Sequence, residues 1–210
     1  MKEDYFTDDF IAEMRERYFR KRKWRRIEPF RKAAVLAIDL QRYFLSPESR
    51  AFLPSAFRFV PKLVGFYSAV EALNVPIIFT RHHHTGGTMV RWWGDEMRRE
   101  DPLNGLLDDF KPFEETIIGK DTYNAFHGTE LGAILRKLGV ETVIITGVMT
   151  HLCCETTARE AFVRGFNVVF PVDGTLTQNR LFHEATLRNL SHGFAVTPLL
   201  GEVLEWLSSG

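Results

Sequence analysis

The segment ETVIITGVMTHLCCETTAREAFVRGFNVVFPVD, residues 141–173, carries the pattern from which the fold class of this chain follows. It begins with a short apolar run at 141–148, continues with a segment of helical spacing at 151–165, and ends with a second apolar run at 166–173. Gly165 stands at the position of a helix C-cap between them. A strand, a helix and another strand in this order predict two parallel strands joined by a right-handed crossover.

Apolar runs and helical segments alternate in the same way along the rest of the chain. The predicted strands are 32–41, 75–82, 115–120, 141–148, 166–173 and 194–198. The predicted helices are 54–74, 128–139, 151–165, 179–193 and 199–207. This alternation predicts a three-layer α/β fold, in which a parallel sheet of six strands has helices on both faces.

The size and charge of the chain favour one domain and a small partner. With 210 residues, of which 45% are hydrophobic and 26% charged, the chain is long enough for a substantial core. We predict a single domain over 1–210, with a helical N-terminal extension at 1–32. Lysine and arginine total 27, as do aspartate and glutamate, so the net charge gives no attraction toward nucleic acid or membranes. A small-molecule substrate is therefore the expected partner, with no nucleic acid and no membrane.

The basic residues gather in RERYFRKRKWRR at 15–26, which has eight of them and one acid. One interpretation is an arm that binds nucleic acid or a membrane. The alternative that we favour is an N-terminal helix whose Tyr18, Phe19 and Trp24 pack down while the charges stay in water. An extension before the first strand is also suited to act as an assembly arm between subunits.

The cysteines and the apolar segments bear on the compartment. Cys153 and Cys154 are the two cysteines of the chain, and adjacent cysteines do not readily pair with each other. The N-terminal residues lack the apolar core of a signal peptide, and no stretch approaches the roughly 18 apolar residues of a membrane span. We therefore expect a soluble protein of a reducing compartment, the cytoplasm.

Three side chains are predicted to meet at one edge of the sheet. Asp39 closes the first strand, Lys120 closes the third, and Cys153 follows the fourth at a predicted helix start. In an open α/β sheet, ligands bind outside the carboxyl ends of the strands, near the point where the strand order reverses. An aspartate and a lysine around a cysteine can remove its proton and stabilise the sulfur anion. Taken singly, the same residues also fit a capping Asp39, a surface Lys120 and a small buried Cys153.

Helical spacing separates the two cysteines. If Thr150 is the N-cap, a stripe facing the core contains Cys154, Ala158, Ala161 and Phe162. Cys153 then lies about 100° away in the first turn, where free N–H groups and the helix dipole favour an anion. We therefore predict that Cys154 is structural and that Cys153 is the nucleophile, with a stabilised thiolate.

Three motifs in this order resemble those of the isochorismatase-like cysteine hydrolase family. They are VLAIDLQRYFL at 35–45, IGKDTYNAFHGTEL at 118–131 and TGVMTHLCCETTAREAFVRGFNVVFPVDGT at 146–175. The likeness runs from about residue 33 to about residue 200 and places Asp39, Lys120 and Cys153 in the expected strand context.

This resemblance implies a doubly wound sheet of order 3-2-1-4-5-6 and a catalytic triad. Cys153 would attack an amide or ureide carbonyl, Asp39 would act as base and then as proton donor, and Lys120 would stabilise charge. A cis peptide between Val148 and Met149 would aim the N–H groups of Met149 and Cys153 into an oxyanion hole. The family implies no cofactor for this chemistry, and it implies a homodimer or homotetramer.

Two departures from the family pattern keep other functions in view. Enzymes that hydrolyse isochorismate resemble this chain at VMTH and YNAF but lack the cysteine, so one alternative is a vinyl-ether hydrolase in which Asp39 donates a proton and Cys153 is a bystander. Nicotinamidases of the family bind a metal through an Asp-x-His motif, whereas FTRHHHTGG at 79–87 has Arg81 and no aspartate, which argues against a nicotinamidase. A second alternative is a scaffold without activity that binds a partner through its basic N-terminal arm.

The three histidines at 82–84 allow a metal site, because alternate side chains of an extended segment point the same way. His82 and His84 would need a third ligand such as Asp95, so we predict no metal and instead a hydrogen bond from His82 to the substrate or a loop.

The long segment at 83–114 is our candidate for a lid or substrate wall, because loops of this length are often functional. Aromatic walls with a few polar groups suit a small-molecule pocket. The predicted substrate-binding residues are Gln41, Phe44, His82, Trp93, Tyr123, Phe126 and His151.

Overall fold

The computed structural model describes residues 1–19 and 32–209, and its sheet is parallel throughout. The strands are β1 (Ala33–Ile38), β2 (Ile77–His82), β3 (Thr116–Lys120), β4 (Thr142–Val148), β5 (Asn167–Val169), β6 (Thr175–Leu176) and β7 (Ala195–Val196). Their order is β3-β2-β1-β4-β5-β7, and β6 pairs with β4 off this path. Since β7 lies within the predicted sixth strand, the predicted order 3-2-1-4-5-6 is confirmed.

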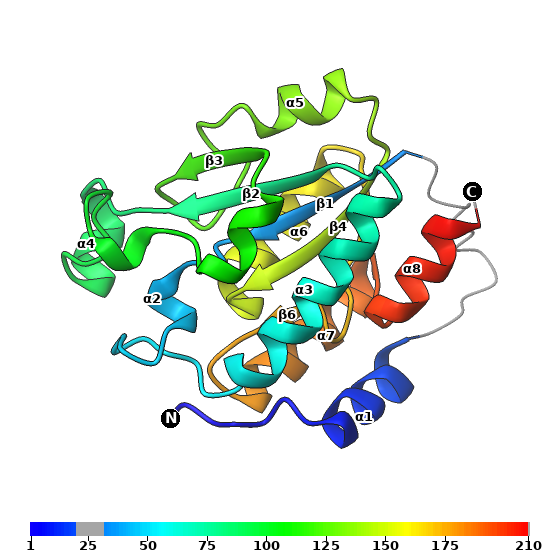
Figure 1. Ribbon diagram of the computed structural model, residues 1–210, viewed down its shortest axis with the longest axis horizontal. Helices are drawn as coiled ribbons and strands as arrows, with labels where there is room; N and C mark the ends of the chain where they lie inside the picture. The colour runs from blue at the N-terminus through cyan, green and yellow to red at the C-terminus, as the bar shows by residue number, and fades with distance from the viewer. Residues whose placement is uncertain (20–31, 210) are drawn as a thin grey trace.

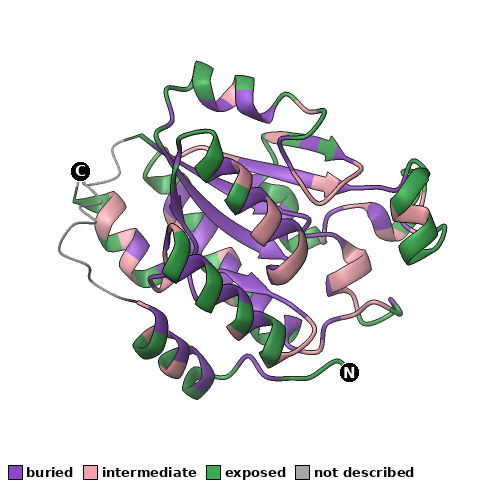
Figure 2. Ribbon diagram, turned by 180° about the vertical axis from the view of Figure 1, so that it is seen from behind, coloured by how far each residue is buried: buried purple, intermediate pink, exposed green. Residues whose placement is uncertain are grey.

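Helices cover both faces of this sheet. They are α1 (Asp8–Tyr18), α2 (Arg42–Leu45), α3 (Ala56–Ala72), α4 (Gly87–Trp93), α5 (Leu131–Lys137), α6 (Glu155–Val163), α7 (Arg180–Gly193) and α8 (Leu200–Ser208). Figure 1 shows α3 and α8 in front of the sheet and α6 behind it. Figure 2 shows the buried strands between helices whose outer surfaces are exposed. The predicted three-layer architecture is therefore correct.

The two central strands explain where the site forms. Every residue of β1 and of β4 is buried, as expected of strands covered on both faces. β1 pairs with β2 on one side and with β4 on the other. The strands that follow β1 in the chain are therefore added first toward one edge of the sheet and then, from β4 on, toward the other edge. A crevice opens at the carboxyl ends of two strands where the strand order reverses in this way.

Gly147 allows the close approach of β4 to β1. Its φ is 112°, and a Cβ built there would lie 2.0 Å from the carbonyl oxygen of Ile38. We expect Gly147→Ala to lower the free energy of unfolding by about 3 kcal/mol or more, because backbone atoms cannot move aside as a flexible side chain can. Gly139→Ala is the matched control, since Gly139 also has a positive φ but has open space around it.

Urea unfolding monitored by circular dichroism measures both variants. The control should lose only the roughly 1–2 kcal/mol of an alanine in a left-handed conformation. Equal losses at the two positions would contradict a steric role for Gly147.

The structure differs from the predicted elements in several places, among them the short helix α2, which was not predicted. β6 was not predicted, because a strand of two residues leaves no pattern in the sequence. The predicted helix 151–165 begins as a π turn, Thr150–Cys154, that continues into α6. The segment 83–114 contains α4 and two short 3-10 helices, Pro102–Asn104 and Asp108–Phe113.

The described part of the N-terminal extension is helical and shares residues 15–18 with the basic run. α1 begins at Asp8, where the hydroxyl of Thr7 accepts a hydrogen bond from the N–H of Phe10. Tyr18 is buried, and Phe19 stacks on Trp206. Most of the basic run, with Trp24, lies outside the described residues. Among the residues that the structure describes, no helix is long and apolar enough to cross a membrane.

Candidate active site

Asp39, Lys120 and Cys153 meet at the carboxyl edge of the sheet. Asp39 follows β1, Lys120 is the last residue of β3, and Cys153 lies in the π turn after β4. The Lys120 ammonium lies 2.7 Å from Asp39 Oδ2 and 3.3 Å from Cys153 Sγ. The side chains of Asp39 and Lys120 are both fully buried. Three groups that are far apart in the sequence thus form one closed polar cluster.

The neighbouring strand holds the Asp39 carboxylate in place. The Thr80 hydroxyl, on β2, donates to Asp39 Oδ1 at 2.6 Å and accepts the backbone N–H of Asp39 at 3.2 Å. Asp39 has a φ of 50°, in the left-handed region that non-glycine residues seldom adopt. Such conformations concentrate at functional sites, where the surrounding structure holds them. The sequence analysis did not single out Thr80 as a site residue, although it directly follows the apolar residues of the second predicted strand, 75–82.

Asp39 and Lys120 form an ion pair whose opposite charges cancel, and the environment of the Cys153 thiol favours its neutral form. Burial opposes the ionisation of Asp39, but the adjacent Lys120 ammonium and other neighbours hold its pKa below the ordinary value. Burial likewise disfavours the Lys120 cation, yet Asp39 and Cys153 keep its pKa above the ordinary value. Burial and the Asp39 carboxylate raise the pKa of the Cys153 thiol, against a smaller opposing effect of Lys120.

Burial and the Asp39 carboxylate thus oppose the thiolate stabilisation that we predicted for Cys153 from a helix start. Thr150 does not cap a helix, since its hydroxyl donates to Thr175 Oγ1 at 3.0 Å and α6 begins only at Glu155. Cys153 is buried, and burial and the Asp39 carboxylate both raise the pKa of its thiol, which favours the protonated form. Nucleophilic attack then requires transfer of this proton to a base.

Cys154 takes the structural place predicted for it. It is fully buried, as are Ala158 and Ala161 on the same stripe. Phe162, which the spacing also placed on this stripe, is half exposed and stacks on Phe194. Helical spacing thus placed Cys154 in the core but extended the buried stripe one residue too far.

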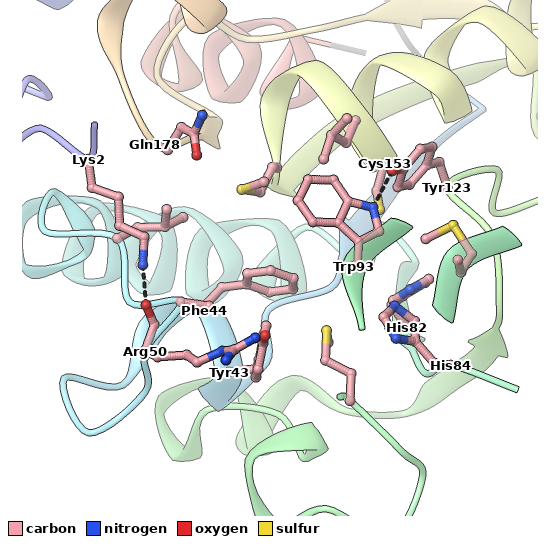
Figure 3. A pocket seen from close by; sticks show the side chains of 16 residues that line it. Lys2, Tyr43, Phe44, Arg50, His82, His84, Trp93, Tyr123, Cys153 and Gln178 are labelled. Carbon is pink, nitrogen blue, oxygen red and sulfur yellow. Dashed lines mark hydrogen bonds between the residues drawn. The ribbon is translucent and has the colours of Figure 1, made fainter. Parts of the chain in front are cut away.

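A cavity of about 210 Å³ opens over Cys153 (Figure 3). Its lining is mostly apolar and aromatic, with a few polar side chains: Lys2, Tyr43, Phe44, Arg50, Ala51, Leu53, His82, His84, Met89, Trp93, Met97, Tyr123, Met149, Leu152, Cys153 and Gln178. Of the predicted substrate-binding residues, it brings together Phe44, His82, Trp93 and Tyr123. Concave apolar sites with few polar groups are typical of small-molecule pockets.

The isochorismatase domain model matches residues 33–199 of the chain. The chain belongs to the isochorismatase family. It is 40% identical to "Nicotinamidase 3" of Arabidopsis thaliana over 185 residues, which cover 84% of this chain and 89% of that protein. A solved cysteine hydrolase from Pseudomonas syringae pv. phaseolicola 1448A is 25% identical, with a TM-score of 0.81 over 87% of this chain and 95% of that one.

Another solved relative raises the question of a metal. The pyrazinamidase of Pyrococcus horikoshii, described in complex with zinc, is 25% identical to this isochorismatase-family hydrolase, with a TM-score of 0.67 over 80% of this chain and 99% of that one. Zinc prefers nitrogen and sulfur ligands in a tetrahedral arrangement with an open route to the ion. The donors present here can be tested against that requirement.

Among the described residues, one cluster of possible ligands converges: Asp39, His82 and Cys153, whose ligand atoms all lie within 4.8 Å of one another. The Lys120 ammonium lies within 3.4 Å of a ligand atom of each of the three. A buried ammonium in that position repels a second cation. The cluster therefore does not fit a divalent metal.

Within residues 1–19 and 32–209, no third ligand lies with both His82 and His84, the histidine pair after β2. His82 and His84 both face the cavity, with ring centroids 5.1 Å apart. The His84 ring lies 3.2 Å from the carbonyl oxygen of Gly94 through Nδ1. Asp95, which we considered as a third ligand, is exposed and paired with Arg98. The donor set of this family member therefore differs from that of a closed zinc site.

Three of the predicted substrate-binding residues lie outside the cavity lining. Phe126 is buried in the core, where it stacks on Phe166, because the chain turns after Tyr123 and points the ring away from the cavity. Gln41 is fully buried and holds the backbone, since its amide donates to the carbonyl oxygen of His82 at 2.9 Å. Both residues support the site without lining it.

His151 also turns away from the cavity. Its ring stacks on Phe182 with centroids 4.3 Å apart, and its Nδ1 lies 2.7 Å from the Thr177 hydroxyl. These contacts join the π turn to α7. We predicted that His151 binds substrate because it lies two residues before Cys153. The geometry of the π turn instead directs its ring away from the cavity, toward Phe182.

Two buried histidines should make the stability of the protein depend on pH. Burial, with the charge of Lys120, lowers the pKa of His82 to about 3, and burial lowers that of His183 to about 3. Unfolded histidine has a pKa of roughly 6.5. Between these values the unfolded chain binds more protons than the folded one, so stability is complete above about pH 6.5 and falls toward pH 3.

We therefore expect the free energy of unfolding at pH 5 to lie up to roughly 2 kcal/mol per histidine below that at pH 7. Urea midpoints at the two pH values measure the difference. His183→Gln, which cannot be protonated, should show a smaller difference than the wild type. Equal wild-type midpoints would contradict the buried neutral histidines.

Proposed function

We propose that this hydrolase cleaves the C–N bond of a small amide, carbamoyl or ureide group through a covalent acyl-enzyme on Cys153. The observation that carries the proposal is the position of the thiol. It lies on the lining of an apolar cavity, beside an ionised Asp39 and within 3.3 Å of the Lys120 ammonium. A nucleophile with an adjacent base and an adjacent cation is the arrangement that acyl transfer needs.

In the first step, Cys153 Sγ bonds to the carbonyl carbon and its proton passes to the Asp39 carboxylate. The carbonyl oxygen becomes negative, and the backbone N–H groups of Met149 and Cys153 are the proposed donors to it. The peptide bond between Val148 and Met149 is cis and lies directly before this turn. When the C–N bond breaks, Asp39 returns the proton to the leaving nitrogen, and a thioester remains.

In the second step, water attacks the thioester carbonyl and gives a proton to Asp39. The C–S bond then breaks, the acid product leaves, and the sulfur takes the proton back. Lys120 stays cationic throughout, because Asp39 and Cys153 hold its pKa above the ordinary value against burial. Its charge stabilises the sulfur whenever the sulfur is negative.

The ionised state of Asp39 bears on the vinyl-ether alternative. Protonation of an ether carbon or oxygen requires a carboxylic acid that carries a proton at rest. Burial favours that acid, but Lys120 and its other neighbours outweigh it and lower the pKa of Asp39. The cluster at rest thus holds its mobile proton on Cys153, which favours nucleophilic chemistry.

Nicotinamide is the first substrate to test. The segment FTRHHHTGG has no aspartate, which argues against a nicotinamidase. The 40% identity to "Nicotinamidase 3" nevertheless makes nicotinamide a candidate substrate. Ammonia release should be measured with nicotinamide, a carbamoyl amino acid and a ureide. Rapid quenching in acid during turnover, followed by intact mass spectrometry, should show one acyl group on the 140–164 peptide. Ammonia release with no adduct on Cys153 under any quench condition would remove the covalent step from the proposal.

Trp93 and Tyr123 close the cavity over Cys153 in Figure 3. The indole N–H of Trp93 donates to the Tyr123 hydroxyl at 2.6 Å, and α4, which carries Trp93, buries no side chain of its own. We expect Trp93→Phe and Tyr123→Phe each to raise KM by roughly 2–10-fold, because each removes one hydrogen bond that holds the wall.

A double variant should be no worse than the poorer single variant, since both remove the same bond. Trp92→Phe is the matched control, because Trp92 lies on the same helix but does not line the cavity. Effects of the two single variants that add fully would contradict a shared bond. Steady-state kinetics decides between these results.

The remaining expectations about partners and compartment are part of this proposal. A small-molecule substrate fits the size of the cavity. A homodimer or homotetramer is expected from the family, with the N-terminal extension as an assembly arm. Two free cysteines agree with a reducing compartment such as the cytoplasm.

A further inference from the structure

We infer that the substrate carries a negatively charged group remote from the scissile bond, and that Lys2 binds this group at the mouth of the cavity. The inference rests on the proposed amide hydrolysis and narrows its substrate class. Lys2 and Arg50 line the same cavity as Cys153 although they come from distant parts of the chain. Figure 3 shows Lys2 and Arg50 beyond Phe44, at the opposite end of the cavity from Cys153.

The segment that carries Lys2 is anchored to the domain. The N–H of Glu3 donates to the carbonyl oxygen of Gln178 at 2.8 Å. The hydroxyl of Tyr5 lies 2.9 Å from His183 Nδ1 and accepts the N–H of Thr177 at 3.1 Å. Tyr5 is buried. These contacts place Lys2 at the cavity mouth, since the residues directly after it have fixed partners.

The Lys2 ammonium has no carboxylate partner among the described residues. It donates to the carbonyl oxygen of Arg50, and burial together with the charge of Arg50 lowers its pKa. Arg50 itself is paired with Glu96, whose second oxygen accepts the Tyr43 hydroxyl at 2.5 Å. One positive charge at the mouth is therefore left without a counter-ion.

The inner end of the cavity does not supply that counter-ion. There the negative charge of Asp39 is balanced by Lys120, and Cys153 and His82 are neutral. The whole cavity thus has a net charge of about +1, with the unbalanced cation at its outer end. A substrate with its amide at Cys153 and an anion at the far end matches this distribution.

A series of amides of increasing chain length, each compared with and without a terminal carboxylate, tests the inference. Succinamate, glutaramate and adipamate each end in a carboxylate, and butanamide, pentanamide and hexanamide replace that carboxylate by a methyl group. We expect kcat/KM to favour one of the acid amides over its neutral counterpart by at least fivefold at low ionic strength. The preference should shrink in 0.5 M sodium chloride, because salt screens an exposed charge.

Substitution of Lys2 assigns the preference to this residue. Lys2→Met should reduce the acid-over-neutral ratio by roughly threefold to fivefold, mainly through KM, because the contact is made in the bound and in the transition state alike. Lys2→Arg should retain most of the ratio. Lys111→Met is the matched control, since it removes a lysine that pairs with Asp108 on the surface. A C-terminal purification tag leaves residues 1–7 in their native contacts.

The outcomes separate this inference from the proposed function. Hydrolysis of nicotinamide or of the neutral amides, with no acid amide preferred, would overturn the inference and leave amide hydrolysis standing. An acid preference that Lys2→Met does not change would also overturn it. Failure of every amide would overturn the inference, and failure of the carbamoyl amino acid and the ureide as well would defeat the proposed function.

Discussion

Cys153→Ala is expected to lower kcat/KM for an amide substrate by at least roughly 10⁴-fold, because the variant lacks the thiol on which the acyl bond is proposed to form. Cys153 Sγ is the nucleophilic atom on the cavity lining next to the ionised Asp39. Ammonia release by variant and wild type, measured at equal protein concentration, gives the ratio. Thermal unfolding of the variant shows whether it is folded.

Cys154→Ala is the matched control for this variant. Cys154 is fully buried at the end of the π turn before α6 and is no part of the proposed machinery. Loss of its sulfur should cost about 1 kcal/mol of stability and leave turnover within a few-fold of the wild type. If Cys153→Ala kept its activity while Cys154→Ala lost it, the choice between the adjacent cysteines would be wrong.

Lys120→Met is expected to remove activity and stability together. Without the ammonium, the Asp39 carboxylate is left buried with only the Thr80 hydroxyl and the Cys153 thiol as partners. Breaking one partner out of a buried ion pair typically costs about 3–5 kcal/mol. The pKa of Asp39 should also rise, because the charge that lowered it is gone, so the group would become a weaker acceptor for the thiol proton.

The double variant separates the two effects. Asp39→Asn leaves Lys120 as an unpaired buried cation, whereas Asp39→Asn with Lys120→Met removes both charges. We expect the double variant to unfold at a higher urea concentration than either single variant, with no hydrolysis in any of the three. Additive losses of stability would show that the two side chains are not coupled.

Much of this site could be predicted before the structure. The alternation of apolar runs and helical segments led to the correct parallel sheet, because the periodicity of buried residues is a local property of the chain. Asp39 and Lys120 each stand at the carboxyl end of a predicted strand. Because parallel strands all end at the same edge of a sheet, both side chains were expected at that edge. Helical spacing also identified Cys154 as the core cysteine.

The local sequence did not predict whether a side chain near the site points into the cavity or into the core. Phe126 follows Lys120 closely enough to suggest the cavity, but its ring packs on Phe166 of a different segment. His151 precedes Cys153 by two residues, yet its ring stacks on Phe182 of α7. The direction of a side chain after a tight turn depends on neighbours that the local sequence does not contain.

By itself, the sequence determined the fold class, the strand order through its family motifs, and the three residues at the carboxyl edge, because these follow from short-range periodicity and from motifs in order along the chain. Only the tertiary structure decided the charge state of Cys153 and the presence of Lys2 in the cavity wall. Both depend on burial and on distances between segments far apart in the chain. Neither has a signature in any one stretch of sequence.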